Sequence, residues 1–191
     1  MRFVIPLSLV ISLSGCISAQ SYIDPALPVL RAEDLQPVAQ PRPVQLLYEF
    51  RTKGAANATA TGHTKPVVME TVTKSGLFST VSETPVAGGR TLALVIDNVP
   101  VTQDAAQKGF ATGLTLGLVG TTVTDGYVCT ATYSAPGAPV KTGSVNHALH
   151  TSIGNATPPA GLTAMKPGDA IPILVQQMTL NALQALRKQG L

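Results

Sequence analysis

The sequence contains no tryptophan, few aromatic residues and few charges of either sign. Of its 191 residues, 4% are aromatic and 12% are charged, and its formal net charge is only +3. Lysine and arginine are scattered along the chain. A protein that binds nucleic acid through the phosphate backbone needs a concentrated basic stripe, which this sequence lacks. Nucleic acid is therefore not an expected partner.

The sequence also lacks the short motifs that mark common catalytic and metal sites. It has no Cys-x-x-Cys pair, no Gly-x-Ser-x-Gly nucleophile elbow and no phosphate-binding loop. His147 and His150 fall on one predicted strand and point to opposite faces, which indicates surface polar residues rather than shared metal ligands. We therefore predict no catalytic residue, no metal and no cofactor, and we expect a protein that is not an enzyme.

The first fifteen residues have the organisation of a bacterial secretion signal. Arg2 supplies one positive charge, and residues 3–13 carry none. This apolar run is well below the ~20 residues of a membrane-spanning helix. It leads into Leu13-Ser14-Gly15-Cys16, which resembles the lipobox of bacterial lipoproteins. The resemblance implies cleavage before Cys16 and a diacylglyceryl group on its thiol, with fatty acids such as palmitate as the membrane anchor.

A lipid on Cys16 places the chain at a membrane, because each buried methylene contributes about 0.8 kcal/mol. Ile17 and Ser18 follow the cysteine. Lipoproteins that are retained in the inner membrane carry aspartate directly after the lipidated cysteine. By resemblance to enterobacterial sorting, this implies an outer-membrane lipoprotein that faces the periplasm. The alternative is an ordinary secretory signal cut near Ala19, which is also a small residue.

The second cysteine, Cys129, has no intramolecular partner once Cys16 carries lipid, so no disulfide is expected. Tyr127, Cys129, Ala131 and Tyr133 share one face of a predicted strand. A reactive thiol or an intermolecular disulfide is the alternative, but a thiol in this setting indicates a small buried apolar residue.

Prolines recur through the segment that follows the lipobox. Proline fixes φ and removes a backbone donor, so residues 16–43 are predicted to form an extended tether that lifts the domain off the membrane surface. The prolines are Pro25, Pro28, Pro37, Pro41 and Pro43. A single folded domain is predicted over residues 44–191.

Hydrophobic periodicity predicts strands at residues 44–51, 77–81, 91–99, 126–135 and 140–153. One helix is predicted to open at Pro66 and end at Gly76, and a second to be capped by Asp169 and to end at Gly190. Residues 54–63 are predicted to be a loop. This order predicts an α+β fold, an antiparallel or mixed sheet with two helices packed on one face.

The layout loosely resembles that of small Gram-negative envelope lipoproteins. Among these are the auxiliary lipoproteins of lipid-exporting ABC systems, the curli secretion lipoprotein and the lipoprotein activators of penicillin-binding proteins. The resemblance lies in the amino-terminal anchor, the helix that runs into Gly76-Leu77-Phe78 and the closing amphipathic helix. It implies an accessory role in the envelope, and similarity of fold does not by itself fix a function.

An uncharged stretch lies between Lys108 and Asp125. On a helix, the glycines of residues 109–124 fall within about 80° of one another and form a smooth groove. On a strand, Phe110 and the leucines share one face. As a helix it would be about 24 Å long, short of the ~30 Å hydrocarbon core, so a spanning helix is not expected.

Three readings of this stretch stay open: a buried core segment, a loop that contacts the membrane or a partner, and a hairpin that inserts when subunits form a ring. Its candidate contact residues are Phe110, Gly113, Leu114, Leu116, Gly117 and Leu118. The sequence thus favours a membrane-anchored, non-enzymatic periplasmic lipoprotein that binds an envelope complex. The alternative is an oligomeric structural or pore-forming lipoprotein of the secretion type.

Overall fold

The computed structural model describes residues 19–99, 101, 122–153 and 161–191. The predicted signal peptide and the lipobox cysteine Cys16 lie outside the described residues. The same holds for every candidate contact residue of the uncharged stretch: Phe110, Gly113, Leu114, Leu116, Gly117 and Leu118.

In the described part of the chain, seven strands form one mixed sheet in the order β1-β7-β6-β5-β2-β3, and β4 pairs with β2. β2 runs parallel to β4 and β5, and the remaining pairs are antiparallel. The strands are β1 (Ala19–Ile23), β2 (Arg42–Thr52), β3 (Ala55–Ala56), β4 (Phe78–Ser82), β5 (Thr91–Val99), β6 (Thr122–Ser134) and β7 (Lys141–Ile153).

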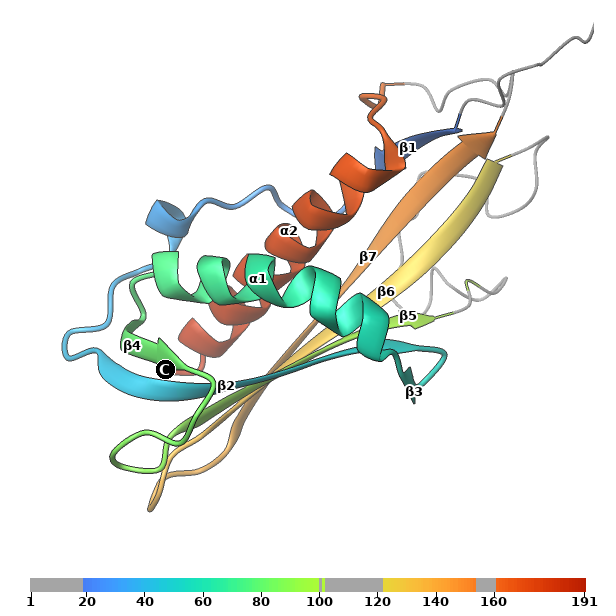
Figure 1. Cartoon of the computed structure of the whole chain (residues 1–191). Coiled ribbons are helices and arrows are strands. Elements are labelled where there is room, and N and C mark those ends of the chain that lie inside the picture. Colours follow the sequence, from blue (N-terminus) through green and yellow to red (C-terminus); the bar gives the residue numbers. More distant parts are fainter. Residues whose placement is uncertain (1–18, 100, 102–121, 154–160) are drawn as a thin grey trace, which may run out of the picture.

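Both α-helices, α1 (Ala58–Lys74) and α2 (Pro167–Arg187), cover the same face of this sheet (Figure 1). α2 packs on β7 and β6, α1 packs on β2, and the two helices contact each other. The core between the layers includes Val72 of α1, Met178 of α2 and Ile96 of β5, all fully buried. The predicted α+β class, with a mixed sheet and two helices on one face, is confirmed. No helix within the described ranges is long and apolar enough to cross a membrane.

The first long helix begins earlier than the sequence predicts. α1 starts at Ala58, so Pro66 lies inside it and residues 58–63 are helical rather than loop. Asn57 caps the helix by accepting a hydrogen bond from the Ala60 backbone N–H at 2.9 Å. The Thr61 hydroxyl accepts the Phe50 backbone N–H at 2.9 Å and ties the first turn to β2. The Asn57 cap and the contact of Thr61 with β2 therefore outweigh the weak helix propensity of residues 58–63.

α2 also begins slightly before the predicted residue. Its N-cap is Lys166 with Pro167 at the first helical position, and Asp169 lies in the first turn rather than at the cap. A carboxylate in the first turn still interacts favourably with the helix dipole.

The proline-rich segment that was predicted to be a free tether is packed onto the domain. It is largely extended, as predicted, but residues 19–23 form the strand β1, which pairs with β7 from Ala19↔Ile153 to Ile23↔Leu149. Tyr22 is fully buried and Leu35 is 4% exposed. The domain thus begins at residue 19 rather than at residue 44.

Polar side chains of α2 form hydrogen bonds with the backbone of this extended segment. Asn181 donates to the Pro28 carbonyl at 2.9 Å, and the Gln177 amide accepts the Leu30 backbone N–H at 2.9 Å. Arg187 donates to the carbonyls of Gln36 and Pro37. The segment is therefore laid along α2. Proline content alone predicted a tether because these partners lie ~150 residues further along the chain, beyond the reach of local patterns.

β7 and α2 approach closely at Gly143, which has no side chain to hold them apart. A Cβ at this position would lie 2.8 Å from the Ala185 Cβ and 3.1 Å from the Ala182 carbonyl oxygen. These neighbours are a short side chain and helix backbone, which cannot move aside cheaply.

We expect Gly143→Ala to lower the free energy of unfolding by about 1–3 kcal/mol, because the new methyl group overpacks the contact between α2 and β7. The matched control is Gly62→Ala on α1, where a Cβ would meet nothing within 4 Å. That change should raise stability by about 0.5–1 kcal/mol. Urea unfolding of both variants measures the difference, and equal midpoints would contradict the close approach.

Candidate functional site

A buried cluster of polar side chains lies at the end of the sheet where β1 and β7 pair. His150 of β7 lies between Asp24, directly after β1, and Thr124 of β6. Its Nε2 is 3.1 Å from Asp24 Oδ2, and its Nδ1 is 2.8 Å from Thr124 Oγ1. His150 and Asp24 are both 3% exposed.

The chemistry of the partners assigns the hydrogen bonds. An ionised carboxylate only accepts, so Nε2–H donates to Asp24 and Nδ1 accepts the hydroxyl proton of Thr124. Asp24 also accepts the Ala26 backbone N–H at 2.8 Å. Burial by itself raises the pKa of Asp24, but the hydrogen bonds from His150 and Ala26 outweigh it and hold that pKa below its ordinary value.

The connectivity of hydroxyl, imidazole and carboxylate is the one that activates a nucleophile in hydrolases. Here the three groups come from three different strand segments, and both ring nitrogens of His150 are occupied by them. The cluster therefore cross-links β1, β7 and β6.

The second histidine of β7, His147, is buried at 4% exposure, and its Nδ1 has no hydrogen-bond partner among the described residues. Burial lowers its pKa to about 4, an effect that nearby Asp24 partly opposes. His147 is therefore a neutral imidazole at physiological pH.

The sequence prediction that both histidines are surface residues is wrong. They alternate between faces as predicted, but residues 147–150 of β7 are buried on both faces. A usable signal was present: Ala148 and Leu149 are consecutive apolar residues inside a strand, a pattern that indicates burial on both sides rather than alternation. Asp24 was missed because it lies in the segment predicted to be a tether.

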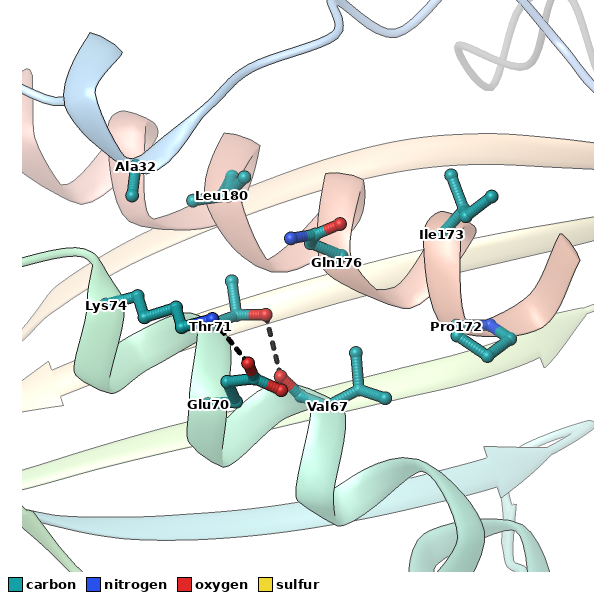
Figure 2. Close-up of a pocket in the computed structure, with 9 residues that line it drawn as sticks. All are labelled: Ala32, Val67, Glu70, Thr71, Lys74, Pro172, Ile173, Gln176 and Leu180. Carbon is teal, nitrogen blue, oxygen red and sulfur yellow. Dashed lines mark hydrogen bonds and ion pairs between the residues drawn. The ribbon is translucent and has the colours of Figure 1, made fainter. Parts of the chain in front are cut away.

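A shallow groove of about 260 Å³ runs between the two helices. Figure 2 shows Glu70 and Lys74 on its α1 wall, with Lys74 Nζ 2.5 Å from Glu70 Oε1. The opposite wall is formed by Ile173, Gln176 and other residues of α2. Lys74 lowers the pKa of the Glu70 carboxyl, but both side chains are exposed, so solvent screens the pair. Among the lining residues, none places a nucleophile beside a base.

The other face of the sheet carries no helix among the described residues (Figure 1). A depression of about 340 Å³ lies there over β2 and β5, near Leu47, Glu49 and Val95. Leu47 is 47% exposed. Along its rim, Lys65 of α1 forms an ion pair with Glu83, with 2.7 Å between Nζ and Oε2.

Cys129 is fully buried, which confirms the prediction of a core thiol. Burial raises its pKa to about 12, so the reactive thiolate is suppressed at neutral pH. Over the ranges that the structure describes, no three histidine, cysteine or acidic side chains are placed to hold a metal ion.

The fold that positions these groups is a two-layer α+β domain. No protein family model matches the chain, and no curated protein matches it in sequence. Among solved structures, the chain is similar to a PelC variant dodecamer from Paraburkholderia phytofirmans, with 11% identity, a TM-score of 0.38, and 89% of this chain and 96% of that chain covered.

The chain is also similar to rare lipoprotein B from Shewanella oneidensis. The identity is 10% and the TM-score 0.37, over 78% of this chain and 93% of that one. At such low identities and TM-scores, neither similarity assigns an activity, a partner or an assembly to this chain.

The buried His147 generates a pH dependence of stability. Its folded pKa of about 4 lies below the ordinary value of about 6.5, so between these values the unfolded chain binds a proton that the folded chain does not. We expect the free energy of unfolding to fall by about 3 kcal/mol as the pH drops through this window.

Thermal unfolding between pH 7.5 and 4.5 measures this effect, and His147→Leu should flatten the profile. The matched control is His63→Gln on α1, an exposed histidine whose replacement should leave the slope unchanged. A His147→Leu profile as steep as that of the parent would contradict the assignment.

Proposed function

We propose that this chain is a lipoprotein of the Gram-negative envelope, anchored by lipid on Cys16 at the outer membrane, with its domain in the periplasm. It acts as a non-enzymatic binding or accessory component of an envelope complex. The observation that carries the proposal is the order of features at the amino terminus. The positive charge of Arg2 is followed by the apolar run and the lipobox, and the first strand begins only three residues after Cys16.

The state of the nucleophilic and basic side chains supports a binding role over catalysis. His150 is only 3% exposed, and Cys129 is a fully buried thiol whose pKa is raised by burial. A general base and its nucleophile have to meet the substrate, and burial keeps the His150 imidazole and the Cys129 thiol away from one. The candidate surfaces for a partner are the shallow groove between the helices and the helix-free sheet face.

The uncharged stretch remains our candidate contact element. Its chain re-enters the described structure at Thr122, the first residue of β6. Thr124 is already part of the polar cluster with His150. The portion free to contact a membrane or a partner is therefore proposed to be residues 109–121.

The anchor is tested by Cys16→Ser. In cells fed labelled palmitate, the parent protein should incorporate label and sediment with membranes, because its acyl chains partition into lipid. The variant should lose both properties. Cys129→Ala is the control and should keep the label, since the Cys129 thiol is buried. A Cys16→Ser protein that stays membrane-bound would overturn the proposal.

The contact element is tested by deleting residues 109–121 while β6 is retained. We expect the domain to remain folded by circular dichroism but to lose the envelope proteins that are crosslinked to the parent in intact cells. A second variant keeps the length and replaces Phe110, Leu114, Leu116 and Leu118 with serine. If both variants unfold, the stretch is core and the contact role is wrong.

Sizing of the detergent-solubilised protein separates the two functional hypotheses. An accessory adaptor should elute at the size of one or two chains. The alternative, an oligomeric structural or pore-forming lipoprotein, requires a much larger species.

A further inference from the structure

One end of the sheet gathers three strand ends. Ala19 at the start of β1 pairs with Ile153 at the end of β7, and Thr122 at the start of β6 pairs with Ser152. Figure 1 shows the β7 arrowhead, the beginning of β6 and β1 side by side. At their opposite ends, β6 and β7 are joined by a turn.

The lipid site lies close to this end by covalent geometry. Cys16 is three residues before Ala19, and an extended chain spans at most about 3.6 Å per residue, so the two lie within about 11 Å of each other. β1 cannot swing out to lengthen the link, because it pairs with β7 and is followed by the Asp24–His150 hydrogen bond. A lipid on Cys16 would therefore hold this end of the sheet at the membrane surface.

Exposed apolar side chains lie at this end on one face of the sheet. Residues paired across antiparallel strands share a face, as do alternate residues along one strand. Ala19 pairs with Ile153, and Val123 pairs with Thr151, two residues earlier on β7. Val123 is 42% exposed and Ile153 is 40% exposed, although branched apolar side chains are normally buried.

A lysine lies at the same end of the sheet, beside the start of β1. Ala19, Met165 and the exposed Lys166 line a common depression of about 300 Å³. Met165 is fixed against β1 by paired backbone hydrogen bonds with Ser21, at 2.8 and 3.0 Å. Of the nearby carboxylates, Asp24 is buried and paired with His150, and Asp169 is exposed in the first turn of α2. Asp125 is half-buried and lies two residues along β6 from Val123.

We propose that this end of the domain, the membrane-facing patch formed by Ala19, Val123, Ile153, Met165 and Lys166, rests on the lipid surface. Its apolar side chains enter the interfacial region, and Lys166 lies at the level of the lipid phosphates. The inference rests on the proposed function, because it takes the lipid on Cys16 as given. It adds an orientation: β6 and β7 extend from the membrane surface toward the turn that joins them, which lies at the far end of the domain.

This orientation places the turn between β6 and β7 far from the lipid. β7 has 13 residues, and an antiparallel strand rises about 3.4 Å per residue, so an upright strand reaches about 40 Å from the surface. Val140 in that turn is 61% exposed. It marks the distal end of the domain.

The absence of tryptophan allows a direct test. Val123→Trp and Val140→Trp each introduce the single tryptophan of the chain, one in the membrane-facing patch and one at the distal end, both at exposed sites. Each full-length protein is purified from membranes and reconstituted in vesicles of phosphatidylethanolamine and phosphatidylglycerol that contain acyl-chain-brominated lipid. Flotation and palmitate label report attachment, and tryptophan emission reports contact with the lipid.

We expect the Val123→Trp emission to be quenched and blue-shifted in brominated vesicles, and the Val140→Trp emission to match its value without bromine. If the protein floats with the vesicles and carries palmitate label, but the Val123→Trp emission is not selectively quenched, the proposed orientation is wrong and the lipid anchor is supported. A protein that neither floats nor incorporates label would overturn the proposed function and this inference with it.

Discussion

The pairing of β1 with β7 is the constraint on which the rest of the molecule depends. It makes the start of the proline-rich amino-terminal segment, which the sequence predicts to be an extended tether, a strand of the sheet. The segment then follows α2, whose Asn181, Gln177 and Arg187 side chains bond its backbone. Because β1 is fixed, Cys16, the site proposed to carry lipid, stays within about 11 Å of the start of the sheet strand β1. A change at this strand would therefore alter both stability and orientation.

The polar cluster makes this pairing specific. Burying a carboxylate and an imidazole costs free energy unless both are hydrogen-bonded. Asp24 and His150 meet this requirement only when β1 lies in the observed register, in which Ile23 is opposite Leu149. A slip of one residue would remove the His150 donor from the buried Asp24 carboxylate and leave it only the local bond from Ala26. The cluster thus penalises alternative registers in a strand of only five residues.

Sequence patterns predict the structure correctly in regions where a single hydrophobic periodicity, that of a strand or that of a helix, dominates. β5 matches its predicted bounds, β6 and β7 were expected as a hairpin, and Cys129 was expected in the core. The failures come from long-range contacts. The first turns of α1 depend on β2 through Thr61, and β1 depends on β7 through partners more than 100 residues away. The cluster of Asp24, Thr124 and His150 could not be predicted, because no local pattern brings the three together.

The bridge between Ser21 and Met165 has a consequence for how copies of this domain can associate. Exposed edge strands invite a second chain to add a strand. On the outer side of β1, part of this edge is already occupied, because Ser21 exchanges both of its backbone hydrogen bonds with Met165. Growth of the sheet from one subunit into the next is therefore blocked along β1. A strand from a second subunit could still add at the other edge of the sheet, where β3 and β4 pair with β2. The two edges are therefore not equivalent, and an assembly built by main-chain pairing would use the β3–β4 edge.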